Sequence, residues 1–433
     1  MTVPASARLA MNRRRSIQAM TVASWLIMLA IVGYLCYSGA AGPMRDLQVY
    51  RDAALALRHG RDLYSVTTVI GLPYTYPPIG AILALPLTLV PYWAGRVAWD
   101  AMICLPLAAV VWFGFRPLLA RAGRAAPAVF AALVGCCVLL QPVRQEFYYG
   151  QVDIFLVALC LTDLRVRSPR WPRGLLIGLA TAIKLEPGVF IIYLLITRRR
   201  RDAAVAALSF AAWTALAWLI EPHDSVTYWT SAIFQTNRLG GNGSAANQSL
   251  RGMILRLFNP HPAPSFVWLT VALAVGLAGF AAARSCWQRG DDMAGIAITG
   301  LLSAALSPVA WIHHLCWLIV ALGVIVGDGR SRARVAAAIA AFALFVSTLP
   351  TWAEHDRGLA VLPTRLFEDT FGLAALALVV IIYRIGGPQG GERGVSQETA
   401  GRRVPSSPAG IPEELPSAAG QHQGTVEGGG GLL

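Results

Sequence analysis

Long apolar runs alternate with short polar segments along most of the chain. A helix needs roughly 17–25 residues to cross a bilayer, and shorter runs can cross only inside a bundle or where the bilayer is thinned. The pattern therefore predicts an all-α, polytopic membrane protein with about 12 transmembrane helices (range 10–13). The clear runs are Met20–Ala40, Trp93–Phe115, Ala203–Ile220, Ser265–Ala283, Val309–Val326, Val335–Leu349 and Phe371–Tyr383. The shorter runs are Ala125–Leu140, Val152–Leu164, Leu175–Ile183, Val189–Ile196 and Met293–Leu306.

Charged residues are scarce, and their positions indicate the topology. Only 14% of the 433 residues are charged, whereas soluble domains have about 25%. The net charge of +13 comes mainly from short basic loops, which the positive-inside rule places in the cytoplasm. This charge therefore indicates membrane orientation, and we expect no nucleic-acid partner. The basic loops are Arg13–Arg15, Arg116–Arg124, Arg165–Arg173, Arg198–Arg201, Arg284–Arg289 and Arg330–Arg334.

This topology divides the chain into three parts. Residues 1–19 are expected to form a cytoplasmic N-terminus, residues 20–385 a membrane domain, and residues 386–433 a cytoplasmic tail. The tail is rich in Gly, Pro, Ser and Gln and lacks apolar periodicity, which predicts disorder. Seven cysteines are scattered without the spacing of a metal site and are expected to be small core residues.

An acid lies close to the expected outer membrane surface, in the loop Gly42–Pro78. Apolar residues recur at helical spacing from Leu47 to Leu57, which predicts an amphipathic helix over Asp46–Arg58 on that surface. Asp46 stands at the start of this helix. It is either a helix cap or first-turn acid stabilised by the helix dipole, or a general base that serves a reaction at this face.

The apolar stretch Leu175–Ile196 is interrupted by Lys184, Glu186 and Pro187. Proline removes a backbone donor and disfavours helix in the residue before it, so we expect two short helices that meet at a charged point. Charges persist inside a membrane when they pair or face a cavity. Lys184 and Glu186 therefore form a structural ion pair, or Lys184 binds an anion such as a lipid phosphate.

Three further polar segments lie on the expected outer face. His313 and His314 follow a Ser-Pro break. Because successive helical residues point about 100° apart, at most one of the two can face a given cavity. Either of them can instead be a core histidine. No His, Asp or Glu set has metal-ligand spacing. The segment Tyr148–Asp153 opens a helix with aromatic residues typical of a membrane interface. The polar segment Asn242–Gly252 is either a flexible loop or part of a site.

Taken in order, these motifs resemble glycosyltransferase family 87. The motifs are D-x-x-V-Y-x-x-A from Asp46, L-Y at Leu63, Y-P-P at Tyr76, G-Q-V-D at Gly150, L-A-T-A-I-K-x-x-P from Leu179, N-Q-S-L-R-G from Asn247 and S-P-x-x-W-x-H-H from Ser307. Members are polyprenol-phosphate-mannose-dependent α-1,2-mannosyltransferases of the GT-C fold. The resemblance implies a GT-C membrane catalytic domain over residues 20–385, in the cell membrane, with its active site on the extracytoplasmic side.

The resemblance also implies roles for particular residues. An acid in the first extracytoplasmic loop is the catalytic base, which corresponds to Asp46, with Asp52 as the competing carboxylate. Lys184 and either His313 or His314 correspond to contacts with the donor phosphate. Because the leaving phosphate needs cations, Arg251 is also expected to bind it. The remaining polar residues are expected to bind the acceptor or the sugar. They are Tyr50, Tyr76, Gln151, Asp153, Asn247 and Gln248.

The expected reaction transfers mannose from a polyprenyl-phosphate donor to a glycolipid or polysaccharide acceptor, with inversion and an α-1,2 linkage. A phosphate leaving group makes a metal dispensable, so no cofactor is expected. One alternative is a GT-C arabinofuranosyltransferase that uses polyprenyl-phosphate-arabinose. Another is a transporter of lipid-linked sugars, although such proteins show paired inverted repeats with matching broken helices, whereas this chain has one clear break.

Overall fold

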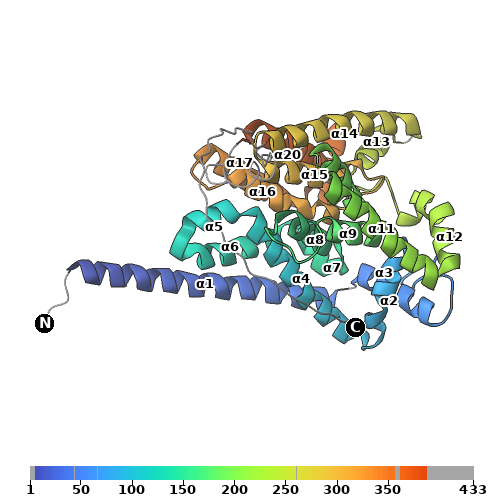
Figure 1. Cartoon of the computed structure of the whole chain (residues 1–433), viewed down its shortest axis with the longest axis horizontal. Coiled ribbons are helices and arrows are strands. Elements are labelled where there is room, and N and C mark those ends of the chain that lie inside the picture. Colours follow the sequence, from blue (N-terminus) through green and yellow to red (C-terminus); the bar gives the residue numbers. More distant parts are fainter. Residues whose placement is uncertain (1–4, 43, 66, 260, 356–360, 388–433) are drawn as a thin grey trace, which may run out of the picture. The chain divides into compact units, whose positions relative to one another are not determined.

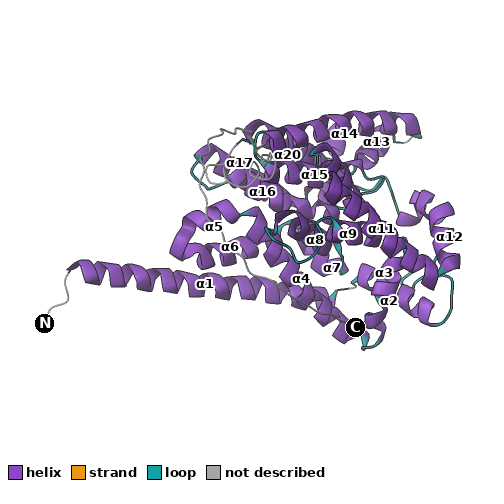
Figure 2. Cartoon of the chain, viewed as in Figure 1, coloured by secondary structure: helices purple, strands orange, loops and turns teal. Residues whose placement is uncertain are grey.

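The computed structural model describes residues 5–387 except 43, 66, 260 and 356–360, and these residues form helices joined by loops, without a β-strand (Figures 1 and 2). The expected disordered tail lies outside the described residues from residue 388 onward. The α-helices are α1 (Ala5–Ala41), α2 (Arg45–Arg58), α3 (Pro78–Leu83), α4 (Tyr92–Gly114), α5 (Arg116–Ala122), α6 (Ala126–Leu139), α7 (Gln141–Tyr149), α8 (Asp153–Arg165), α9 (Leu175–Ile183), α10 (Val189–Ile196), α11 (Arg200–Ile220), α12 (Pro222–Thr230), α13 (Leu250–Phe258), α14 (Ser265–Gln288), α15 (Asp292–Leu306), α16 (Leu318–Val326), α17 (Arg332–Val346), α18 (Leu349–His355), α19 (Val361–Glu368) and α20 (Thr370–Ile385). The 3₁₀ helices are η1 (Leu85–Thr88), η2 (Gly123–Ala125), η3 (Glu186–Gly188), η4 (Ala232–Phe234), η5 (Thr236–Leu239) and η6 (Ile312–Trp317).

Six helices among the described residues are long and apolar enough to cross a membrane: Arg14–Ser38, Tyr92–Gly114, Arg116–Leu139, Arg200–Ile220, Ser265–Gln288 and Arg332–His355. Helices α7 and α8 meet at a bend of 118° and form a broken span or a re-entrant loop. Shorter apolar helices cover Glu186–Ile196, Asp292–Leu306, Ile312–Val326 and Thr370–Ile385. The sequence-based figure of about 12 transmembrane helices therefore stays a prediction.

The bundle is built around α15 and α16, in which nearly every residue is buried. Helix α15 packs against α14 and α20, and α16 packs against α4 and α17. Outer helices keep apolar residues exposed at helical spacing: Leu269, Leu273 and Leu277 of α14 are 55%, 64% and 66% exposed. An apolar exposed face of this kind on a bundle helix suits contact with lipid tails.

The predicted break within Leu175–Ile196 is confirmed. Helix α9 ends at Ile183, Lys184 is extended, and η3 and α10 follow. The other end of α9 is held by Asp163 of α8, whose Oδ2 accepts hydrogen bonds from the backbone N–H groups of Gly174 (2.9 Å) and Ile177 (3.1 Å). Because these N–H groups lie in the first turn of α9, Asp163 caps the helix from outside and fixes where Lys184 emerges.

A smaller apolar cluster lies beside the bundle and is formed mainly by α2, α3 and the loop between them. The helix expected over Asp46–Arg58 is present as α2, with Leu47, Tyr50 and Ala54 buried. The segment between α2 and α4 forms α3 and η1. Helix α2 contacts α3, η1 and α7, so the first loop packs against the bundle near the α7–α8 bend.

Candidate active site

Asp46 stands in the first turn of α2, and the structure decides between the two structural interpretations of this acid. The N-cap of α2 is Met44, with φ of 35° and no side-chain cap, so Asp46 is a first-turn acid and not the cap. Its carboxylate lines a cavity, and among the described residues no cation lies within ion-pair distance of it. The competing acid Asp52 accepts hydrogen bonds from Gln48 Nε2 (2.6 Å) and Val69 N–H (3.2 Å) and does not line the cavity.

Three polar side chains support the Asp46 side of the cavity. The hydroxyl groups of Tyr50 and Tyr76 both donate to Gln151 Oε1, at 2.9 and 3.4 Å. Since this fixes the amide oxygen as the acceptor, the amide nitrogen of Gln151 is left to donate toward Asp46. Gln151 follows Gly150, which has a φ of +71° and lies against Leu47 of α2, so the α7–α8 bend places the amide beside the carboxylate.

Partial burial of Asp46 changes its acidity. Loss of solvation raises the pKa of the Asp46 carboxyl to about 6, while the Gln151 amide and the positive charge of Lys184 oppose the rise. A carboxylate with a pKa near 6 is mostly ionised at neutral pH and is a stronger base than a solvated one. Perturbed acids in clefts are candidates for catalysis, which makes Asp46 chemically suited to accept a proton.

The opposite side of the cavity carries Lys184 within a set of acids and histidines. Its ammonium donates to Asp153 Oδ1 at 2.6 Å and to His314 Nε2 at 2.9 Å, and Glu186 Oε2 lies 3.9 Å away. Because an ammonium can only donate, His314 Nε2 accepts and its proton lies on Nδ1, which is 3.0 Å from Glu186 Oε2. The two sequence interpretations of Lys184 are thus compatible, since it is ion-paired and also lines the cavity.

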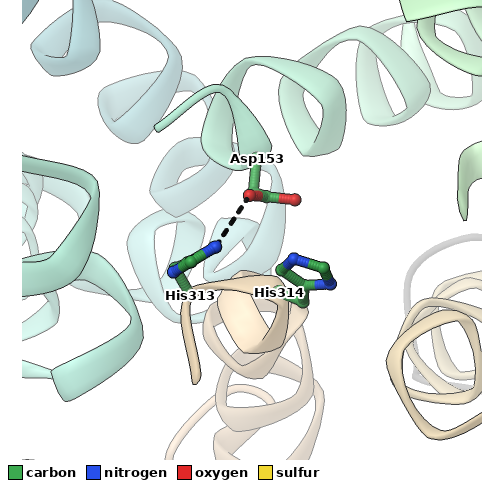
Figure 3. Close-up of side chains that lie close together, drawn as sticks. All are labelled: Asp153, His313 and His314. Carbon is green, nitrogen blue, oxygen red and sulfur yellow. Dashed lines mark ion pairs between the residues drawn. The ribbon is translucent and has the colours of Figure 1, made fainter. Parts of the chain in front are cut away.

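The two histidines differ in position (Figure 3). Both are buried, but His314 lines the cavity and His313 does not; the Nε2 atom of His313 lies 3.9 Å from Asp153 Oδ2. Asp153, His313 and His314 each offer one atom within a 4.8 Å group that could hold a metal ion, a set that the sequence spacing does not indicate. Lys184 already places positive charge against Asp153 and His314, which disfavours a second cation there.

The cavity between these two sides has a volume of about 270 Å³. It combines two acids, amides, hydroxyls, aromatic rings and cations with apolar residues, a mixture that suits a sugar joined to an anionic group. The polar and aromatic lining residues are Asp46, Thr75, Tyr76, Gln151, Lys184, Glu186, Tyr228, Gln235, Thr236, Arg238, Ser307, Trp311 and His314.

Comparison with known proteins identifies the family. The model of glycosyltransferase family 87 matches residues 74–308. The chain belongs to this family. It is similar to a polyprenol-phosphate-mannose-dependent α-(1-2)-phosphatidylinositol mannoside mannosyltransferase of Mycobacterium tuberculosis, with 31% identity over 382 residues, 82% of this chain and 89% of the relative. It also resembles a corresponding pentamannoside mannosyltransferase of Mycolicibacterium smegmatis, with 34% identity over 323 residues, 73% of this chain and 76% of the relative. No solved structure matches.

Membership of family 87 makes this chain a glycosyltransferase, which excludes the transporter as the primary activity. The matched region contains Gln151, Asp153 and Lys184, whereas Asp46 and His314 lie outside it on either side. The structure nevertheless brings Asp46, Gln151, Lys184 and His314 to the same cavity.

Six of the residues expected at the site lie outside the lining of the cavity. Tyr50, Asp153 and His313 contact lining residues: Gln151, Lys184 and His314, respectively. The other three are Asn247, Gln248 and Arg251. Asn247 is buried, and its Oδ1 accepts from the backbone N–H of Ala310 at 3.0 Å. Gln248 is also buried; its Oε1 accepts from Gly372 N–H at 2.7 Å. Arg251 donates to Thr236 Oγ1 at 2.8 Å and lies over the ring of Trp268. In this structure Asn247 and Gln248 bind backbone groups, and Arg251 binds the side chain of Thr236, which lines the cavity.

Other lining residues escaped the sequence analysis. Arg238, Tyr228 and Trp311 all line the cavity. Trp311 belongs to the S-P-x-x-W-x-H-H motif, and this position in the motif could have identified it as a site residue. Arg238 and Tyr228 come from the segment between α11 and α13, whose local pattern gives no indication of which side chains turn inward.

Proposed function

We propose that this family 87 enzyme transfers mannose from polyprenyl-phosphate-mannose to a glycolipid acceptor at the extracytoplasmic face. The transfer inverts the anomeric centre and forms an α-1,2 linkage. The observation that carries the proposal is the cavity itself, in which the Asp46 carboxylate, without an ion-pair partner among the described residues, faces the same space as Lys184 and His314. The names of the relatives supply the donor and the acceptor class.

The two sides of the cavity suit the two halves of an inverting displacement. An acceptor hydroxyl attacks C1 of the sugar while the bond between C1 and the phosphate oxygen breaks, and that electron pair remains on the phosphate. Asp46 accepts the hydroxyl proton as the new bond forms. Lys184 and His314 lie where positive charge and hydrogen-bond donors stabilise the phosphate as its negative charge increases. A β-linked donor then gives an α-linked product.

The distribution of basic residues supports an extracytoplasmic site. Helix α9 begins beside Arg173, in a basic loop, and ends at Ile183, next to the cavity residue Lys184. Helix α11 begins at Arg200, and the cavity residue Tyr228 follows its far end. Under the positive-inside rule, both helices run from the cytoplasm toward the cavity.

The relatives favour mannose over arabinose, because each similar protein described above is mannose-dependent by name. The test is to incubate membranes containing the full chain with radiolabelled polyprenyl-phosphate-mannose and a phosphatidylinositol mannoside, with polyprenyl-phosphate-arabinose in parallel. We expect a labelled glycolipid from the mannose donor only, with an α-1,2 linkage by NMR. Membranes that lack the chain are the control. Absence of a chain-dependent mannosylated product, or preference for arabinose, would contradict the proposal.

A further inference from the structure

Three basic side chains line the cavity: Lys184, His314 and Arg238. Lys184 is within ion-pair distance of two acids, Asp153 and Glu186. With neutral imidazoles this group has one positive and two negative formal charges, so it carries a net negative charge. Such a group orients polar atoms but attracts an anionic phosphate only weakly. A further cation is therefore needed to bind the phosphate.

Arg238 has the opposite balance of charge. Among the described residues, no carboxylate lies within 4 Å of its guanidinium group. Its Nη2 donates to the backbone carbonyl of Tyr64 at 2.6 Å, while its Nε is buried and has no hydrogen-bond partner among the described protein atoms. Buried donors normally have partners, so an unpaired guanidinium nitrogen beside a cavity indicates that a ligand completes the arrangement.

The segment that carries Arg238 is held on two sides. On one side, Tyr64 accepts from Arg238 through its carbonyl, while its hydroxyl donates to the carbonyl of Tyr76 at 2.8 Å. On the other side, Arg251 donates to Thr236 Oγ1 at 2.8 Å. A guanidinium whose backbone segment and one nitrogen are already fixed loses little further freedom when it binds an anion.

We propose that Arg238 binds the phosphate of the lipid-linked sugar donor and stabilises the phosphate released in the reaction. This inference rests on the proposed function and extends it. The donor is a phosphodiester with one negative charge; when the bond from C1 to oxygen breaks, the electron pair stays on oxygen and the product polyprenyl phosphate carries a second charge. A guanidinium group presents several donors in a plane that matches phosphate oxygens, and its attraction grows with that charge. Lys184 then acts beside Arg238 as a second cation near the leaving phosphate and also holds His314.

The test compares two inhibitors that differ only in the phosphate group, undecaprenyl phosphate and undecaprenol. Both are measured on the purified full-length enzyme and on its Arg238→Gln and Arg238→Lys variants. We expect Arg238→Gln to weaken inhibition by undecaprenyl phosphate at least about tenfold and to leave inhibition by undecaprenol unchanged. Arg238→Lys should recover part of the loss. Arg251→Gln removes an arginine that holds the same segment from outside the cavity, so it should change both inhibitors alike.

Two results would overturn this assignment while the proposed function stands. One is unchanged inhibition by undecaprenyl phosphate in Arg238→Gln. The other is an equal loss for both inhibitors, which would indicate a structural role. Failure of the proposed function is distinguishable, because the wild-type enzyme would then form no mannosylated product and no inhibition could be measured.

Discussion

The two sides of the cavity hold their acids in contrasting ways. On the α2 side, Asp46 has hydroxyl and amide groups nearby and no cation within ion-pair distance among the described residues. On the α8–α9 side, Asp153 is 2.6 Å from Lys184 and Glu186 is 3.0 Å from His314. An acid bound to a cation is a poor proton acceptor, whereas a partly buried acid without one is a better base. The difference indicates which carboxylate can do chemistry and which ones organise charge.

Apart from replacement of Asp46 itself, the largest expected effect comes from breaking the Lys184 side. Lys184→Met should lower kcat/KM by about 10²–10³-fold, because an electrostatic contact near the leaving group is lost. It also leaves Asp153 and Glu186 without their cation, which should destabilise the fold by about 3–5 kcal/mol. Steady-state kinetics and thermal unfolding check both effects.

A second variant separates these two effects. Adding Asp153→Asn to Lys184→Met removes one stranded charge and should restore part of the stability but not the activity. If activity returned with stability, the Lys184 side would have only a structural role.

The pH dependence tests the Asp46 side. Because burial raises the pKa of Asp46 to about 6, kcat/KM should fall about tenfold per unit below pH 6 and level off above it. A pKa raised on folding also means that the folded protein binds the proton more tightly, so Asp46 lowers stability as the pH rises from about 4 to 6.

A second acid outside the membrane helices titrates in the same range and provides the control. Burial raises the pKa of Asp224 to about 6, with help from a hydrogen bond to Asp62. Asp224→Asn should keep the pH profile of the wild type, since Asp224 does not line the cavity. Loss of the acidic limb of the pH profile in Asp224→Asn would show that this limb reports the titration of Asp224 and not of Asp46.

A substitution at Gly150 tests whether the two sides of the cavity must keep their present separation for catalysis. A Cβ on Gly150 would lie 2.6 Å from Leu47 Cβ, beside Asp46, and the residue has a φ of +71°. Gly150→Ala should lower kcat by about tenfold by moving α2 and cost about 1–2 kcal/mol of backbone strain. Gly123, with φ of +54° and open space around it, is the control: Gly123→Ala should show the strain without the loss of activity. Equal activities of the two variants would contradict this.

The smallest effect concerns the support behind His314. Asn247→Ala leaves the N–H of Ala310 without its side-chain acceptor, which should cost about 1–3 kcal/mol in thermal or chemical unfolding, with kcat lowered only a few-fold. Asn242→Ala removes an amide oxygen that has no partner among the described residues and should change little. An unchanged stability of Asn247→Ala would show that this hydrogen bond does not hold the segment.

The sequence predicted the features that depend on local pattern. The proline and charges fixed the break at Lys184, and apolar spacing fixed the helix α2. Polarity alone could not separate Asn247 and Gln248, which bond to backbone inside the protein, from residues that face the cavity. Arg238 lies in a segment without periodicity, so its direction depends on the carbonyl of Tyr64, far away in the sequence. The cluster of Asp153 with His313 and His314 likewise exists only after folding.

The central claim is that Asp46 is the general base. The most direct test measures turnover of polyprenyl-phosphate-mannose by Asp46→Asn and, as a control, by Asp52→Asn. Asp52 is a neighbouring acid of the same helix that does not line the cavity. We predict a fall of about 10²–10⁴-fold in kcat for Asp46→Asn, with a thermal midpoint at pH 7 no lower than that of the wild type, while Asp52→Asn keeps its activity and loses stability. Turnover by Asp46→Asn within a few-fold of the wild type would contradict the account.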